Sequence, residues 1–505
     1  MRYSTFSFQE QYRPFFKKNG QWFLLILCAI AAARMFLFSA AFPFFGNVDE
    51  QLHLDLIVKY AQGHVPQTIE KFSQESIDLI IGYGSPEYRC PADSQAACRK
   101  EKTQLNAYVQ RARNVEDTQP PVYYAVASVW YNLGHYMGLK GGHLLYWTRF
   151  LNIPIYVLFL WISFRLLVRF FPDNLFLQTG VPVLLAIFPQ DVFYTLNSDV
   201  LSPLLSTAGF FCLLGLYQSG RKSGLFFHLL SGLCVSLSFL NKFSNIAILV
   251  LFGFIMTVRV KQIVKQRALA DQGAFYQDLS KIAVALAAAG LPILFWILRN
   301  YFVLDDITGS AEKIRELGWT VKPLRDFFYH PLFSSWLGFV KFWHDLMALY
   351  WRGELVWHSV RIASRFLDFF YSLSSLLFVA FFMLRFVTSR TKRDAVAQSF
   401  PYAMSLLVFS LSVLFLIIMS LSFNFNDSPY PSRDYPYMVS GRLITGALLP
   451  FLIVYLTGFE FLLAKLNLIP IREVLVLVIA LSVMISEFLL SYNVFTSPYN
   501  WFHLI

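Results

Sequence analysis

The chain has 505 residues, of which 56% are hydrophobic and only 14% are charged, and its mean hydropathy is +0.50. Soluble domains carry about 25% charged residues, so this composition excludes an ordinary water-facing fold. The net charge of +11 does not indicate nucleic-acid binding, because Lys and Arg stand in short clusters between apolar runs, as in the cytoplasmic loops of membrane proteins.

The apolar residues come in blocks of roughly twenty, the length that crosses a bilayer as a helix. The short alternating segments of a membrane β-barrel do not occur. We therefore predict an all-α polytopic membrane protein with about eleven transmembrane helices. Their expected bounds are 22–43, 148–168, 176–193, 200–217, 225–240, 244–258, 282–300, 366–386, 400–422, 442–463 and 471–491.

Basic residues fix the expected topology. Arg13, Lys17 and Lys18 precede the first span and hold the N-terminus in the cytoplasm. Pro120–Met137 is apolar enough to suggest another span, but that span would place two later basic clusters outside (Arg221-Lys222; Arg259, Lys261, Lys265 and Arg267). We therefore expect residues 120–137 to lie flat at the membrane surface. Arg34, the charge within the first span, should face the bundle interior.

This topology divides the chain into five parts. Residues 1–21 form a cytoplasmic N-terminus, and residues 22–300 form a transmembrane core that includes a large external loop at 46–146. Residues 301–365 form a second external loop with interfacial helices. The C-terminal transmembrane helices occupy residues 366–491, and an external tail occupies residues 492–505. The expected location is a plasma or inner membrane, as a multi-pass protein.

Five cysteines are present. Cys28, Cys212 and Cys234 lie in apolar segments and are expected to be inert core residues. Cys90 and Cys98 lie in the large external loop, where an even pair can form a disulfide. The sequence leaves open whether they are bonded.

An acidic pair, Asp49-Glu50, comes directly after the first span, with His53 behind it. A carboxylate at this depth can act as the general base that deprotonates an acceptor hydroxyl or amine. The alternative interpretation is that Asp49 and Glu50 are only the solvated carboxylates of a helix terminus. His53, considered alone, is more simply an ordinary loop histidine without a catalytic role.

Three cations from distant segments are expected on the external face: Arg149 at the start of the second span, Lys242 after the fifth, and Arg442 before the tenth. Because the positive-inside rule disfavours cations there, a phosphate-binding site is indicated. The alternative is snorkelling of each side chain to lipid headgroups. Asp199 is expected on the same face, where it can pair with a cation or position a substrate.

No cofactor is indicated. Asp305-Asp306 and Asp427 lack His or Cys partners at ligand spacing, so a divalent metal has no support. The chain contains no nucleotide-binding fingerprint.

Several segments, in chain order, resemble the motifs of GT-C glycosyltransferases of the protein mannosyltransferase and aminoarabinose transferase kind. They are Asp49-Glu50 with His53 (D-E-x-x-H), Gln119-Pro120-Pro121-Val122-Tyr123-Tyr124, Arg149, Asn197-Ser198-Asp199, Leu237-Ser238-Phe239-Leu240-Asn241-Lys242-Phe243, and Gly441-Arg442. The order of these pieces along the chain carries the resemblance.

The resemblance implies an inverting transfer of a sugar from a polyprenyl-phosphate donor on the extracytoplasmic side. Asp49 would be the catalytic base, assisted by Glu50, and Arg149, Lys242 and Arg442 would hold the donor phosphate. His53, Gln119, Tyr124 and Asp199 would line the substrate pocket. The acceptor stays open between a lipid, a polysaccharide and a protein, and the expected partners are the lipid-linked sugar and membrane lipids, without nucleic acid. A transporter or flippase of lipid-linked saccharides and a non-catalytic scaffold are the alternatives.

Overall fold

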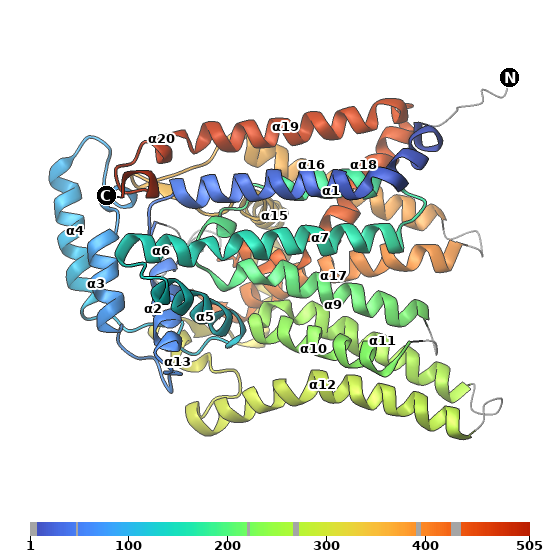
Figure 1. Ribbon diagram of the computed structural model, residues 1–505, viewed down its shortest axis with the longest axis horizontal. Coiled ribbons are helices and arrows are strands. Elements are labelled where there is room, and N and C mark those ends of the chain that lie inside the picture. Colours follow the sequence, from blue (N-terminus) through green and yellow to red (C-terminus); the bar gives the residue numbers. More distant parts are fainter. Residues whose placement is uncertain are drawn as a thin grey trace.

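Long helices lie side by side in the computed structural model, which describes residues 8–46, 49–219, 223–265, 272–389, 395–425 and 436–504 (Figure 1). Within these ranges, nine helical stretches are long and apolar enough to span a membrane, and α8 and α10 are two shorter apolar helices at the positions of the other two predicted spans. The predicted all-α polytopic fold is confirmed.

The nine stretches and the two shorter helices lie at the positions of the eleven predicted spans. Their bounds are α1 Phe8–Ala41; α6 Gly141–Phe150 with α7 Asn152–Phe170; α8 Leu175–Ala186; η3 Ser198–Leu201 with α9 Ser202–Ser219; α10 Leu225–Asn241; η5 Phe243–Asn245 with α11 Ile246–Lys265; α12 Gln272–Leu304; α16 Arg365–Ser389; α17 Ala395–Ser422; η8 Gly441–Ala447 with α18 Leu448–Lys465; and η9 Ile469–Ile471 with α19 Arg472–Leu490.

Shorter elements complete the described fold. The helices are α2 Glu50–Ala61, α3 Gln74–Tyr83, η1 Pro86–Tyr88, α4 Gln95–Val109, α5 Val122–Tyr136, η2 Asp191–Tyr194, α13 Ala311–Glu316, η7 Leu324–Tyr329, α14 Pro331–Ser334, α15 Trp336–Arg352, α20 Tyr492–Phe495 and η10 Trp501–His503. Two antiparallel pairs of two-residue strands are present, β1 Thr320–Val321 with β4 Phe423–Asn424 and β2 Val356–Trp357 with β3 Val360–Arg361.

Helices α2 to α5 gather at one end of the bundle, on the left of Figure 1, and we call this end the Asp49 end. Helix α1 begins near the opposite end, and α20 lies at the Asp49 end. The two ends of the described chain therefore lie at opposite ends of the bundle, which agrees with the odd number of spans that the sequence predicts.

Helix α5 corresponds to the apolar segment that was predicted not to cross the membrane. It has 15 residues, and it packs on α2 with Tyr123 and Tyr124 fully buried. Val126, Val129 and Leu133 are exposed at helical spacing on its other side. An apolar stripe of this kind fits a helix lying at a membrane surface, and its depth in a bilayer stays a prediction.

The predicted third span, 176–193, is too long. Helix α8 ends at Ala186, and residues 187–197 continue as a buried, largely irregular segment around η2. Pro189 disfavours helix at the residue before it, and Arg34 bonds the carbonyl oxygens freed at this helix end, at 3.4 Å from Ala186 O and 2.6 Å from Phe188 O. Pro189, Gln190 and Asp191 mark this break in the sequence, but the apolar residues on either side of them carried the predicted span across it.

Arg34 faces the bundle interior, as predicted, and only 6% of it is exposed. Its guanidinium also pairs with Glu487 of α19, with Nη2–Oε1 at 3.0 Å and Nε–Oε2 at 3.1 Å, and it contacts the Tyr194 hydroxyl. The first and last spans are thus joined by a buried ion pair.

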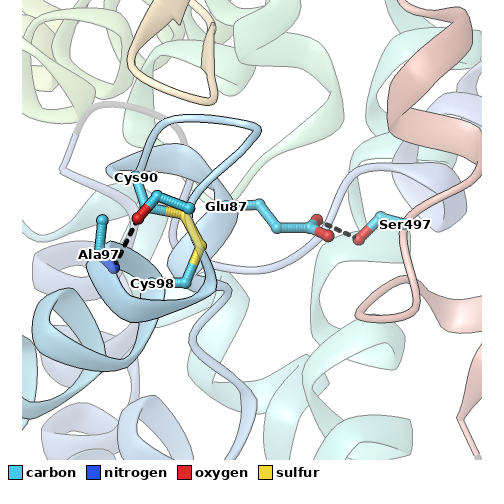
Figure 2. Close-up of a disulfide and its surroundings, with 6 residues drawn as sticks. Glu87, Cys90, Ala97, Cys98 and Ser497 are labelled. Carbon is cyan, nitrogen blue, oxygen red and sulfur yellow. Dashed lines mark hydrogen bonds between the residues drawn. A yellow bond between two sulfur atoms is a disulfide. The ribbon is translucent and has the colours of Figure 1, made fainter.

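Cys90 and Cys98 form a disulfide, which settles the question that the sequence left open (Figure 2). Beside it, Glu87 accepts a hydrogen bond of 2.6 Å from Ser497 Oγ, and its carbonyl oxygen accepts one of 2.6 Å from the backbone of His358. The segment that directly precedes the disulfide therefore contacts both the β2–β3 hairpin region and the C-terminal segment through Glu87.

Candidate functional site

Three short 3-10 turns meet at the ends of neighbouring spans. Turn η8 packs against both η3 and η5, and a side-chain amide and a hydroxyl bond the backbone of η3. Asn241 Nδ2 donates to Ser198 O at 2.9 Å, and Thr445 Oγ1 donates to Asp199 O at 3.3 Å. Irregular backbone is tolerated at such depth only when its polar groups are satisfied within the protein or line a polar space.

These turns bring together four charged residues, which we call the Asp49 cluster: Asp49, Asp199, Lys242 and Arg442. Arg442 Nη2 lies 2.6 Å from Asp49 Oδ2, and its Nη1 lies 3.8 Å from Asp199 Oδ2. Lys242 Nζ lies 2.7 Å from Asp199 Oδ1. Cations and carboxylates therefore alternate, and four residues that are up to 393 positions apart in the sequence form one group.

Asp49 stands in an unusual position. It is the N-cap residue of α2 and adopts the left-handed conformation, with φ at 65°, yet its side chain does not cap the helix. The carboxylate reaches Arg442 instead and is 31% exposed. Burial alone would raise the pKa of Asp49, but Arg442, followed by Lys313 and His53, holds this pKa below its usual value. Strained backbone of this kind clusters at functional sites.

A second group flanks the cluster. His53 Nδ1 and the Tyr124 hydroxyl form a hydrogen bond of 2.8 Å, and both side chains are buried. Burial, together with the neighbouring cations Lys242 and Arg442, lowers the pKa of His53 to about 4, against the opposing effects of Glu116 and Asp49. His53 is therefore neutral at pH 7.

Glu116 and Lys313 were not singled out from the sequence. Glu116 is buried and pairs with Lys313 of α13. Burial would raise the pKa of Glu116, but Lys313, His53 and Lys242 hold it below the usual value, against Asp49. The backbone N–H of Gln119 donates to Glu116 O at 3.0 Å, and the half-buried Gln119 side chain forms no hydrogen bond with the four residues of the Asp49 cluster.

Glu354 is a further acidic residue that sequence reasoning missed. It accepts a hydrogen bond of 2.5 Å from Ser440 Oγ, and the same hydroxyl lies 3.3 Å from Arg442 Nε. Glu116, Lys313 and Glu354 all lie among many other charges in the two large loops, and no spacing distinguishes them there. Only the three-dimensional structure shows that they approach the span ends.

Glu50 and Arg149 occupy a different place from the one predicted. Both side chains are fully buried, with Arg149 Nη2 at 2.7 Å from Glu50 Oε1. The guanidinium makes five hydrogen bonds, to Glu50 and to the carbonyl oxygens of Ser39, Phe42 and Pro43, and stacks over Phe44 at 3.8 Å.

Glu50 in turn accepts from the backbone N–H groups of Phe45 and Leu196. Every donor of Arg149 is occupied, so this residue has no free N–H for a phosphate, and Glu50 is not exposed to assist a base. We therefore correct both roles: the pair fastens the end of α1 to the start of α2 and to α6.

No metal centre is formed by the described part of the chain, where no group of three or more His, Cys, Asp or Glu residues could hold an ion. Asp306 caps the start of α13 by accepting from the backbone of Ala311 at 2.8 Å, and Asp427 lies outside the described residues.

Comparison with known families places most of the chain in a family of membrane proteins. Residues 34–426 match DUF2142, a family of predicted membrane proteins, and this is well over half of the chain. The chain belongs to the DUF2142 family. The matched region contains Asp49, Asp199 and Lys242, whereas Arg442 lies beyond it. No curated protein and no solved structure matches the chain.

Proposed function

We propose that this DUF2142 member is a membrane glycosyltransferase that uses a polyprenyl-phosphate sugar as donor. Asp49 is the base, and Lys242 and Arg442 bind the donor phosphate. The observation that carries the proposal is the Asp49 cluster: a partly exposed carboxylate on strained backbone, 2.6 Å from a cation, at the mouth of several spans. The GT-C resemblance supports the same three residues.

The reaction balances with these groups. An acceptor hydroxyl or amine attacks the anomeric carbon of the donor and forms the new bond, and the bond from that carbon to the phosphate oxygen breaks. The phosphate leaves with the electron pair, and the acceptor proton passes to Asp49. Cations placed at the leaving phosphate stabilise its charge.

Ion pairing within the cluster suggests how donor and base are coupled. Arg442 pairs with Asp49, and this contact makes the carboxylate a weaker base because it lowers the pKa of Asp49. A donor phosphate competes for the same guanidinium, which can bind it bidentately. Transfer of Arg442 from Asp49 to the phosphate would release Asp49 as a stronger base only when donor is bound.

The test is release of polyprenyl phosphate by protein in liposomes, measured with a panel of polyprenyl-phosphate hexoses and pentoses. Asp49→Asn should lower the release rate roughly 10²–10⁴-fold, because the general base is lost. Binding of polyprenyl phosphate itself should persist in this variant, whereas Lys242→Gln should weaken it.

Asp93→Asn is the matched control, since Asp93 is an exposed aspartate of the same large loop. Wild-type protein that fails to bind polyprenyl phosphate would contradict the proposal. A rate of release in Asp49→Asn equal to that of the control would remove Asp49 from the role of base. Movement of an intact lipid-linked sugar across the liposome membrane without release would favour the flippase alternative.

A further inference from the structure

Helix α4 carries a basic surface that the Asp49 cluster does not use. Residues 89–111 contain five cations but only two carboxylates, Asp93 and Glu101. All five cations are exposed, and no side chain among them forms a hydrogen bond or an ion pair with a described residue. We call these cations the α4 surface: Arg89, Arg99, Lys100, Lys102 and Arg111.

The carboxylates of the same external loop are used differently. Residues 46–146 contain eleven Asp and Glu against nine Lys and Arg, so the loop as a whole is slightly acidic. Four of its carboxylates, Glu50, Asp55, Glu116 and Asp117, are buried in ion pairs. Because much of the negative charge is neutralised inside the fold, the α4 surface is left with an excess of positive charge.

A covalent link holds this surface in place. The disulfide joins Cys90, which follows Arg89, to Cys98 in the first turn of α4 (Figure 2). Ser94 Oγ caps the same turn by accepting a hydrogen bond of 3.1 Å from the backbone of Ala97. Cations on a rigid support lose less conformational freedom when they bind a ligand, so the binding free energy is more favourable.

A small recess adjoins the α4 surface. Its volume is about 10 Å³, which is room for one group of the size of a water molecule or a hydroxyl. The lining includes two cations of the α4 surface, Arg89 and Lys102, and one carboxylate, Glu101. Ser85 also lines it, is only 6% exposed, and its hydroxyl has no hydrogen-bond partner in the part of the chain that the structure describes.

The surroundings of α4 indicate the class of partner. Helix α4 lies at the far left of Figure 1, beyond α3 and the ends of the spans, so it lies away from lipid headgroups. Between residues 89 and 111, Tyr108 is the only exposed large hydrophobic residue, whereas a protein interface needs an apolar core. Exposed Gln95, Thr103 and Gln104 offer hydrogen bonds to hydroxyl groups.

We propose that the α4 surface binds an anionic glycan, a soluble sugar polymer that carries carboxylate or phosphate groups. The cations of α4 contact the acidic groups of this polymer, and the recess at Ser85 takes one sugar hydroxyl. The proposal does not depend on the proposed transferase activity, so either can fail alone.

The experiment measures equilibrium binding by the full chain in phosphatidylcholine nanodiscs. The probes are polygalacturonate, which carries carboxylates, phosphomannan, which carries phosphates, and neutral dextran. The wild-type protein should bind at least one acidic glycan and not dextran, and the acidic glycan that binds identifies the recognised group. Salt raised from about 0.1 M to about 1 M should weaken binding, because the Debye length falls from about 10 Å to about 3 Å.

The triple variant Arg99→Gln/Lys100→Gln/Lys102→Gln should bind the acidic glycan about tenfold more weakly or less, since contacts between charged groups are lost. It should melt at the wild-type temperature, because these side chains have no internal ion pair to lose. The matched control is Arg165→Gln/Lys261→Gln/Lys265→Gln, which removes three exposed cations at the opposite end of the bundle and should bind like the wild type.

Ser85→Ala tests the recess and should weaken binding roughly twofold to tenfold, the effect of one neutral hydrogen bond. Equal affinities of the two triple variants would overturn the surface, and so would a wild-type protein that binds neither acidic glycan. Binding of polyglutamate or of phosphatidylglycerol vesicles as tight as that of the glycans would overturn the choice of a glycan as partner.

Discussion

Arg149 and Lys242 show why residue roles are hard to read from a sequence. Both are cations at predicted external ends of spans, and both fit a motif of the same enzyme family. In the structure Arg149 is fully buried against Glu50, whereas the Lys242 side chain is 12% exposed and pairs with Asp199. The two cations differ in burial because each pairs with a different carboxylate in the folded protein. That carboxylate comes from a distant segment of the chain, so the residues around each cation in the sequence do not reveal it.

The Glu50–Arg149 pair yields a stability prediction. Arg149→Gln should destabilise the protein by about 3–5 kcal/mol, because it leaves the Glu50 carboxylate buried without its counter-charge. Thermal unfolding in detergent measures this, with Arg165→Gln as the exposed control on the neighbouring helix. The double variant Glu50→Gln/Arg149→Gln should recover part of the loss. A melting temperature of Arg149→Gln equal to that of the control would contradict the structural role.

His53 yields a prediction on pH. The unfolded chain protonates this histidine below its ordinary pKa of 6.5, whereas the folded chain does so only near 4, because the ring is buried. Stability should therefore fall as pH falls from 6.5 towards 4, by at most about 3 kcal/mol at roughly 1.4 kcal/mol per pH unit. The pKa values of Asp49 and Glu116 lie below their ordinary values of 3.8 and 4.5. These two carboxylates therefore lose their contribution to stability only at a pH below those ordinary values.

Melting temperatures of His53→Gln between pH 6.5 and 5 should depend less on pH than those of the wild type. The control is His135→Gln, since His135 is exposed on α5. If both variants keep the full wild-type dependence, another group is responsible for the acid sensitivity.

At the scale of elements, the ends of the membrane-spanning helices determine where the side chains of the Asp49 cluster meet. Hydropathy predicts where helices cross a membrane, because a run of about twenty apolar residues has few other stable solutions. It could not predict that three spans open with 3-10 turns, since these turns are buried and carbonyl oxygens of η3 accept hydrogen bonds from the side chains of Asn241 and Thr445. The Asp49 cluster depends on those turns, so its geometry was not accessible from the sequence.

Turn η8 depends on close contact with α15. A side chain at Gly441 would overlap the backbone of Tyr350. Gly441→Ala should therefore displace η8, move Arg442 from Asp49, weaken polyprenyl phosphate binding, and cost about 1–3 kcal/mol of stability. Equilibrium binding and thermal unfolding measure the two effects.

Gly253→Ala is the matched control, because a methyl group at this helical position meets open space. If Gly441→Ala binds polyprenyl phosphate as tightly as Gly253→Ala does, the packing of η8 on α15 does not position Arg442.

At the scale of the whole molecule, the order of the spans is clear, but the side of the membrane on which the Asp49 end lies remains a prediction from basic residues. Exposed positions described by the structure offer a direct test. Tyr136 on α5 is 90% exposed and lies at the Asp49 end, while Arg169 is exposed at the opposite end.

In a background without Cys28, Cys212 and Cys234, Tyr136→Cys should react with an impermeant thiol reagent in intact cells and Arg169→Cys should not. The bonded pair Cys90–Cys98 offers no thiol. Both positions should react after permeabilisation. The reverse pattern in intact cells would place the Asp49 cluster on the cytoplasmic side and contradict the predicted topology.

The ion pair between Arg34 and Glu487 has a consequence for biogenesis. A ribosome makes the arginine first and the glutamate more than four hundred residues later, so for most of synthesis this guanidinium lacks its carboxylate in an apolar environment. The nascent first span must then remain near water, translocation machinery or other polar groups until α19 arrives. Completion of the bundle is thereby coupled to completion of the chain, and a polypeptide released before residue 487 would carry a recognisable defect for membrane quality control.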